Sequence, residues 1–128
     1  MKQVIICFLF SCFGLIACNN GPQDCKRFRD GTFILAGNGG NYTIVRQGNW
    51  QLETKSGSTD TSTFAVEWLD DCTYTLKPYP SYFKKHPNES TEEMMTVVID
   101  KTTANSYFET TTGNFFPGGM KGELVKVK

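Results

Sequence analysis

Few side chains in this sequence are of the types that commonly do chemistry, and they form no catalytic pattern. His86 is the only histidine, and Ser81 is close enough in sequence to suggest a dyad. However, residues 84–88 are hydrophilic, which is typical of an exposed loop histidine rather than a general base. We therefore expect a protein that is not an enzyme.

Carboxylates offer a second chemistry, the binding of calcium through hard oxygen ligands. Asp70 and Asp71 follow Glu67, and Asp60 lies in the preceding loop. Their order and spacing match no calcium-binding loop, so a polar turn is the better interpretation. We expect neither a metal nor another cofactor.

Arg46 is the most unusual candidate for a binding residue. It follows Tyr42 and Ile44 at alternate positions, which places it on the inward face of a predicted strand. A buried arginine needs a partner, and the candidates are Glu53, Glu67 or the carboxylate of a ligand. We single out Arg46 and Glu67 as a possible interior polar site. The alternative is that the strand frays and Arg46 lies at the mouth of the fold.

Strands must position these residues, because apolar residues past Asp30 recur at every second position in short runs. The predicted strands are roughly 32–36, 42–47, 50–54, 64–69, 73–77, 94–100, 106–110 and 123–128. The one long connection, from Pro78 to Glu93, has room for a helical turn before Pro87. The fold class is therefore all-β, an antiparallel meander of about eight strands.

Alternation also assigns the faces of the strands. Phe64, Val66 and Trp68 share a core face, and Glu67 faces water. The other core candidates are Phe33, Leu35, Tyr42, Ile44, Trp50, Leu52, Tyr74, Leu76, Val97, Ile99 and Phe108. Residues 115–120 are expected to form a loop that caps one end or offers a contact patch. Such a sheet closes into a small lipocalin-like barrel or half-barrel, although a two-sheet sandwich has the same pattern.

The first residues are typical of an export signal. Residues 4–17 are mostly apolar and follow Lys2, but the run is too short to cross a bilayer. Leu15-Ile16-Ala17-Cys18 resembles the lipobox of bacterial lipoproteins, in which the cysteine is acylated and becomes the mature N-terminus. The alternative is an ordinary signal cut near Ala17. We divide the chain into a signal peptide (1–17), a lipidated Cys18 with a flexible leader (18–30) and one β domain (31–128).

Cys7 and Cys12 are removed with the expected signal peptide, and Cys18 is expected to carry the lipid, so two cysteines remain free to pair. Cys25 and Cys72 are 47 positions apart, and an oxidising periplasm favours their pairing. A metal site is the alternative, but two cysteines and one histidine without a CxxC spacing fall short of a structural zinc set. We expect a disulfide.

Two motifs carry a further resemblance. Residues 25–33 read C-x-x-F-x-x-G-x-F, and residues 68–76 read W-x-x-x-C-x-Y-x-L. Together they are similar to a family of short Gram-negative lipoproteins of the Bacteroidota type, whose members sometimes carry a topoisomerase IV name. The resemblance implies a lipoprotein with a paired Cys25 and Cys72, but no activity.

Length and charge exclude several classes of function. The chain has 128 residues, enough for one domain, and 13 basic residues balance 13 acidic ones. A multidomain enzyme is excluded, and no basic track supports nucleic-acid binding or strand passage. We expect an outer-membrane lipoprotein facing the periplasm, held by its lipid, with a structural or protein-interaction role toward another envelope protein. The alternative is a lipocalin-like binder of a small apolar or amphipathic ligand.

Overall fold

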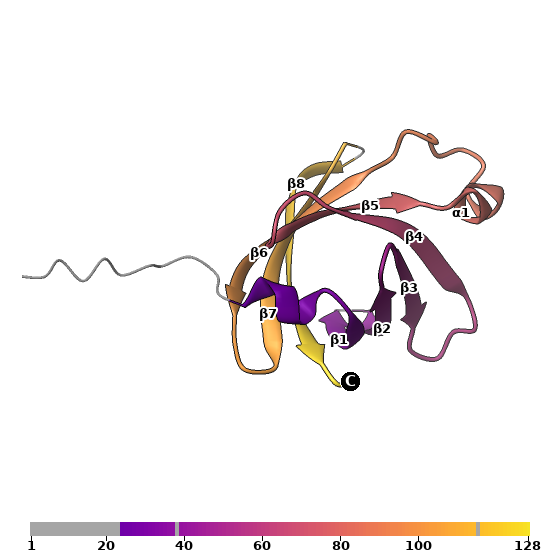
Figure 1. Cartoon of the computed structure of the whole chain (residues 1–128). Coiled ribbons are helices and arrows are strands. Elements are labelled where there is room, and N and C mark those ends of the chain that lie inside the picture. Colours follow the sequence, from indigo (N-terminus) through magenta and orange to yellow (C-terminus); the bar gives the residue numbers. More distant parts are fainter. Residues whose placement is uncertain (1–23, 38, 115) are drawn as a thin grey trace, which may run out of the picture.

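A computed structural model describes residues 24–37, 39–114 and 116–128 of the chain. The elements, shown in Figure 1, are η1 (Cys25–Phe28), β1 (Gly31–Gly37), β2 (Gly40–Gln47), β3 (Trp50–Lys55), β4 (Thr61–Trp68), β5 (Thr73–Pro78), α1 (Pro80–Lys85), β6 (Met95–Thr102), β7 (Ser106–Gly113) and β8 (Phe116–Lys126). Here η1 is a short 3-10 helix.

The strands form a closed antiparallel barrel in which each strand pairs with the next along the chain, and β8 returns to pair with β1. The predicted eight-strand meander and its closure into a small barrel are confirmed, and the sandwich is excluded. Closure pairs every strand on both sides, so no long sheet edge is left to associate with another chain.

Short turns join most of the strands, as the glycines in the sequence indicate. Gly48, between β2 and β3, has a φ of 57°, and Gly57, between β3 and β4, has a φ of 80°. These left-handed conformations suit glycine because it has no Cβ. The long connection between β5 and β6 contains α1, which is the predicted helical turn.

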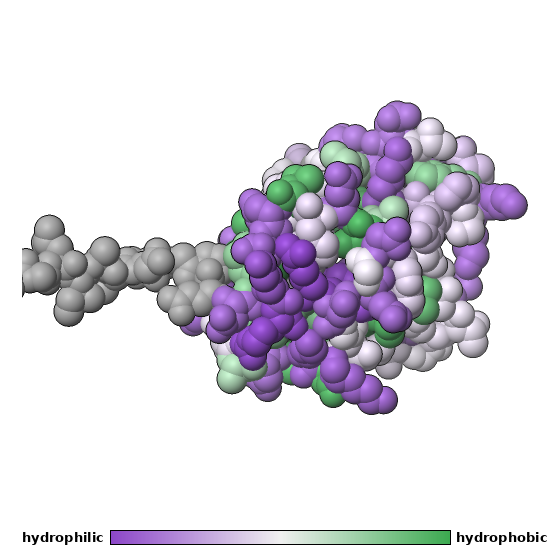
Figure 2. All heavy atoms as spheres, in the orientation of Figure 1, coloured by the Kyte–Doolittle hydropathy of each residue, from purple (hydrophilic) through white to green (hydrophobic). Residues whose placement is uncertain are grey.

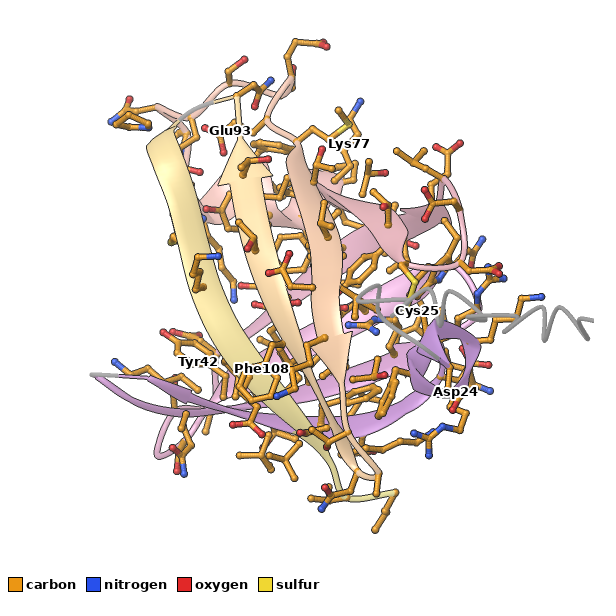
Figure 3. The ribbon with its side chains drawn as sticks, turned by 90° about the vertical axis from the view of Figure 1, so that its left-hand side faces the viewer. Asp24, Cys25, Tyr42, Lys77, Glu93 and Phe108 are labelled. Carbon is orange, nitrogen blue, oxygen red and sulfur yellow. A yellow bond between two sulfur atoms is a disulfide. The ribbon has the colours of Figure 1, made fainter. Side chains whose placement is uncertain are left out.

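The two ends of the barrel differ. We call the end covered by η1 the closed end, and the end formed by the β1–β2, β3–β4 and β7–β8 turns the open end. Cys25 and Phe28 of η1 are buried. Figure 3 shows Cys25 and Tyr42, which belong to the closed and the open end, on opposite sides of the barrel. Within the leader that we expected at residues 18–30, Cys25–Phe28 form η1 and pack into the fold, which corrects the expected flexibility for these residues.

Most of the residues that we predicted to be in the core are buried, but three of them face outward instead. Within the described part of the chain, the buried apolar side chains are Cys25, Phe28, Phe33, Ile44, Phe64, Val66, Tyr74, Leu76, Val97, Ile99, Tyr107 and Leu124. Trp50, Leu52 and Phe108, which we placed inside, lie on the outer face and are only half-buried. Their neighbours Gln51 and Tyr107 take the interior positions instead.

The sequence also led to expectations for residues near the two ends of the chain. The segment expected to be a loop at residues 115–120 belongs from Phe116 onward to β8, which pairs with β7. The signal peptide, Cys18 and Phe115 lie outside the described residues. Within the described part of the chain, no helix has the length and apolar character to cross a membrane.

Candidate functional site

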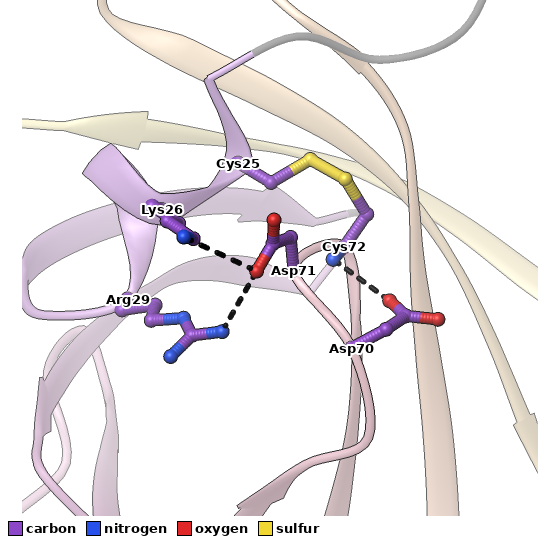
Figure 4. The surroundings of a disulfide bond; sticks show 6 residues. All are labelled: Cys25, Lys26, Arg29, Asp70, Asp71 and Cys72. Atoms are coloured by element: carbon purple, nitrogen blue, oxygen red, sulfur yellow. Dashed lines mark hydrogen bonds and ion pairs between the residues drawn. A yellow bond between two sulfur atoms is a disulfide. The ribbon is translucent and has the colours of Figure 1, made fainter.

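A disulfide holds the closed end together. Cys25 and Cys72 are bonded, with Cα atoms 5.3 Å apart, as predicted. Figure 4 shows the bond joining η1 to the turn before β5. On the surface beside it, the Asp71 carboxylate lies 3.3 Å from the Arg29 guanidinium and 3.8 Å from the Lys26 ammonium. These exposed ion pairs add little compared with the covalent link.

Arg46 lies inside the barrel at this closed end, with 1% of its surface exposed. Its Nε donates to the Gln51 side-chain oxygen at 2.7 Å, and Nη1 donates to the Phe28 carbonyl at 2.9 Å. Its Nη2 donates to the hydroxyls of Tyr74 at 2.8 Å and Tyr107 at 2.7 Å. The prediction that Arg46 points inward is confirmed, and the alternative of a frayed strand is wrong.

Aromatic rings surround this guanidinium. Its central carbon lies 4.4 to 5.9 Å from the ring centres of Phe33, Trp68, Tyr74 and Tyr107. Ring faces attract a cation, so the cage compensates part of the cost of burying the charge. Burial alone would lower the pKa of Arg46, but its electrostatic interactions with Tyr74 and Tyr107 outweigh this and raise it. The guanidinium therefore stays charged.

None of the described ion pairs joins a carboxylate directly to Arg46. Glu67, our sequence-based candidate, is exposed on the outer face of β4 opposite Thr75. The interior pairing of Arg46 with Glu67 is therefore corrected: residues 66 and 68 point inward, and the intervening side chain points out.

Two other glutamates reach the arginine through one intermediate side chain each. Gln51, which accepts from Arg46, donates its Nε2 proton to the Glu53 carboxylate at 2.8 Å. The Tyr74 hydroxyl, which also accepts from Arg46, donates to Glu109 at 3.2 Å and lies 3.0 Å from the Tyr107 hydroxyl. We call Arg46, Gln51, Tyr74 and Tyr107 the arginine layer.

Strand periodicity places the two glutamates one step above the arginine layer. Glu53 lies two residues beyond Gln51 on β3, and Glu109 lies two residues beyond Tyr107 on β7, so each pair shares the inward face. In a closed ring of eight strands, β3 and β7 are opposite each other. The two carboxylates therefore reach the barrel interior from facing walls.

A cavity of about 270 Å³ occupies the interior above the arginine layer and reaches the open end. Both glutamates line it, together with Gln51, Tyr74 and Thr111. The remaining walls are largely apolar and include Leu35, Ala36, Tyr42, Ile44, Leu76, Met95, Val97, Met120 and Leu124. Gly122 on β8 also lines the cavity, and a Cβ at this position would lie only 2.9 Å from the Leu35 side chain.

The surroundings shift the pKa values of the groups facing this cavity. Burial raises the pKa of Glu109 to about 7, although Arg46 and the Tyr74 hydroxyl oppose the shift. Burial also raises the pKa of Glu53 above its ordinary value, against the hydrogen bond from Gln51. Burial raises the pKa of Tyr107 to about 12 and that of Tyr74 well above its ordinary value, so both hydroxyls stay protonated.

The other candidate residues do not join this site. The His86 ring stacks on Tyr82 at 4.1 Å between ring centres, and its Nδ1 lies 3.0 Å from the Tyr82 carbonyl. Its described hydrogen bonds do not include Ser81. Asp70 accepts from the backbone N–H of Cys72 at 2.9 Å, which makes it a turn residue. Within residues 24–37, 39–114 and 116–128, no three His, Cys, Asp or Glu side chains are grouped to hold a metal ion.

Sequence reasoning named Glu53 only as a possible partner of Arg46 and did not consider Glu109. Trp50, Leu52 and Phe108 are large and apolar, and we therefore expected their side of each strand, rather than the side that carries the glutamates, to face the interior. Comparison of the chain with protein-family models, curated proteins and solved structures finds no match.

Proposed function

We propose that this protein is a binding protein whose barrel holds one small amphipathic molecule. The observation that carries the proposal is the cavity of about 270 Å³ into which Glu53 and Glu109 extend from opposite walls. This replaces the structural or interaction role as the leading hypothesis and develops the alternative drawn from the sequence.

The contrast between the two halves of the barrel supports binding. The closed half is packed by the arginine layer and the aromatic rings around it, as expected where an eight-stranded barrel serves only as a scaffold. The open half combines empty space with two carboxylates, each of which has one described hydrogen bond from the arginine layer. A buried carboxylate costs stability unless it is solvated or paired, so a purely structural core would not favour this arrangement.

The dimensions limit the size of the ligand. The cavity is slightly smaller than the roughly 300 to 1,000 Å³ that is typical of sites for drug-sized ligands. A small ligand satisfies this limit. Its apolar part would lie against residues such as Leu76, Val97 and Leu124, and its polar part against the glutamates.

We propose further that Cys18 carries a lipid that tethers the barrel to the outer membrane on its periplasmic side. Six residues separate Cys18 from Cys25, and such a segment spans at most roughly 25 Å. Cys25 belongs to the closed end. The tether would therefore hold the closed end near the bilayer and direct the open end into the aqueous compartment.

The surface offers less support for a protein-interaction role. Among the residues that the structure describes, the large apolar side chains with substantial exposure are Leu69, Met94, Val98, Met120 and Val127. On the face shown in Figure 2, hydrophobic residues form small areas among hydrophilic ones rather than one continuous patch. The interaction role therefore stays a prediction that the following experiment also tests.

Native mass spectrometry of the detergent-extracted protein from the cells that make it tests the binding function. We expect a retained small molecule that is lost in Thr111→Phe, because Thr111 is buried and its replacement fills the cavity. Thr112→Phe is the matched control, because Thr112 is exposed on the opposite face of the same strand. Retention by both variants, or a protein partner with no small molecule, would contradict the proposal.

A further inference from the structure

The charges around the cavity do not balance unless one of them is neutralised. Arg46 supplies one positive charge, and Glu53 and Glu109 supply two negative charges when both are ionised. The cavity is then left with one excess negative charge in surroundings where ions are poorly solvated.

The other polar groups around Glu109 do not supply the missing cation. Tyr74 from β5 and Tyr107 from β7 stay protonated. Asp100 from β6 adds a further negative charge nearby. Lys121 of β8 lines the cavity, but its side chain is 80% exposed, and its ammonium lies 3.0 Å from the Thr110 hydroxyl and 4.0 Å from Asp100.

A proton restores the balance in the ligand-free protein. Burial raises the pKa of Glu109 to about 7, so this carboxyl is mostly protonated below neutral pH. The positive charge of Arg46 is then matched by Glu53, which it reaches through Gln51. A monocationic ligand placed between the two glutamates balances the same charges with Glu109 ionised.

We propose that the cavity takes a small monocationic amine with an apolar body, that its ammonium lies between the Glu53 and Glu109 carboxylates, and that its binding releases the Glu109 proton to solvent. This inference rests on the proposed binding function. In the step, the O–H bond of the Glu109 carboxyl breaks, its electron pair stays on the carboxylate, and a hydrogen bond from the ammonium replaces it. The amine keeps its own protons, and the charge within the cavity is unchanged.

The position of Arg46 argues against an anionic ligand. Four of its N–H groups are occupied within the arginine layer and by the Phe28 carbonyl, and the side chain is almost completely buried. It does not line the cavity. The charged groups that line the enclosed part of the cavity are the Glu53 and Glu109 carboxylates, and ionised carboxylates repel an anion.

Calorimetric titration of the detergent-solubilised full chain tests the inference with three probes of similar size: benzylammonium, benzyl alcohol and benzoate. We expect benzylammonium to bind at least tenfold more tightly than the neutral alcohol, and benzoate to bind most weakly. Repeating the titration at pH 6 in buffers of different ionisation enthalpy counts the protons. We expect a release of roughly 0.9 proton per amine bound, because a group with a pKa of about 7 is mostly protonated at that pH.

Variants show which carboxylates bind the ammonium and which one releases the proton. Glu109→Gln should lower the benzylammonium affinity at least tenfold and abolish proton release, and Glu53→Gln should lower the affinity. Glu67→Gln, on the outer face, is the matched control and should change neither. Because the three-probe series uses the unaltered protein, it decides the question even if a variant fails to fold.

The outcomes separate the two proposals. Equal binding of the amine and the alcohol would overturn the cationic ligand and leave the binding function standing. Tightest binding of benzoate would also overturn it and would point to Arg46 instead. Amine binding without proton release would refute the exchange. Binding of none of the three probes would contradict both proposals.

Discussion

Arg46 combines two features that usually exclude each other, full burial and a charge without a directly bonded carboxylate. Its charge is compensated by four hydrogen bonds, by aromatic ring faces and by two glutamates that act through Gln51 and Tyr74. Because the arginine satisfies acceptors on η1, β3, β5 and β7, it links distant parts of the chain around one side chain.

Arg46→Ala should reduce the free energy of unfolding by about 3 to 5 kcal/mol, because it leaves buried acceptors without a donor. Arg46→Lys should recover only part of the loss, since an ammonium cannot reproduce the planar set of donors. Urea denaturation followed by tryptophan fluorescence measures both variants. Lys84→Ala, which removes an exposed cation of α1, is the surface control, with an expected change below about 1 kcal/mol. Similar losses for Lys84→Ala and Arg46→Ala would refute this role of the arginine layer.

Glu109 should make stability depend on pH in an unusual direction. Its pKa is about 7 in the folded protein and near 4.5 in the unfolded chain, so the folded state holds the proton more tightly. The stabilising contribution is therefore complete below pH 4.5 and is lost as the pH rises through about 7, by at most about 3 kcal/mol.

The comparison of wild type with Glu109→Gln isolates this effect, because glutamine cannot ionise. Denaturation at several pH values between about 4.5 and 8 should show that the wild type loses stability relative to the variant as pH increases. A constant difference between the two proteins across this range would mean that Glu109 titrates alike in the folded and unfolded states.

Among the elements, η1 is short but has a large structural role. It has only four residues, yet Phe28 is buried, the Phe28 carbonyl accepts from Arg46, and Cys25 is bonded to Cys72. The helix closes one end of the barrel because the disulfide holds it there. The arginine layer therefore depends on a covalent link that forms only under oxidising conditions.

The double variant Cys25→Ser/Cys72→Ser should lose up to about 4 kcal/mol of stability, the loop-entropy value for the chain that the bond closes. We also expect η1 to detach more readily, which should make the backbone amides of β5 near Cys72 exchange faster with solvent. Thermal unfolding and hydrogen exchange measure the two effects. Reduced wild-type protein is the control and should resemble the variant; an unchanged melting temperature would contradict the assigned role of η1.

On β3, polar side chains face inward and bulky apolar ones face outward, the reverse of the usual pattern, and on β7 Glu109 faces the cavity while Phe108 faces outward. On β3, Leu52 faces outward between Val45 and Thr63 of the neighbouring strands, and Glu53 faces the cavity. On β7, the Phe108 ring lies 5.7 Å from the Lys101 ammonium on the outer face. This inversion occurs where the barrel is hollow, as expected for strands that line a binding site.

For the molecule as a whole, the two ends have separate tasks. The disulfide, η1 and the arginine layer stabilise the closed end, and the cavity occupies the open end. Residues of both sequence motifs, including Phe28, Phe33, Trp68 and Tyr74, lie around Arg46 at the closed end. The motifs therefore lie mainly in the structural half of the barrel, although Tyr74 and Leu76 also line the cavity, and the cavity glutamates lie outside them.

Attachment of the whole molecule to the membrane through Cys18 can be tested directly. We expect wild-type protein to incorporate a fatty-acid probe and to sediment with the outer membrane, and Cys18→Ser to lose the label and remain unprocessed or mislocalised. Labelling followed by membrane fractionation measures both properties. Cys7→Ser, within the expected signal, is the control that should keep the label. An unlabelled wild-type protein, with equal membrane recovery of Cys18→Ser, would refute lipidation.

The amino-acid sequence by itself determined the number of strands, their order and the disulfide, whereas it left the inward direction of Arg46 open against a frayed strand. These features depend on local alternation, on turn residues such as Gly48 and on the count of cysteines, all of which can be read along the chain. Closure into a barrel, rather than a sandwich, was decided by the pairing of β1 with β8, which are distant in sequence.

Only the tertiary structure decided which face of β3 and β7 points inward and which carboxylates meet. On β3 apolar and polar residues alternate, and the hydrophobic rule favoured the wrong face. On β7 the adjacent Tyr107 and Phe108 are both aromatic, so the local pattern does not choose between the two faces. The buried guanidinium selects the other register, because Gln51 and Tyr107 must face inward to accept its protons. That choice carries Glu53 and Glu109 into the same cavity, a long-range consequence that alternation along single strands did not predict.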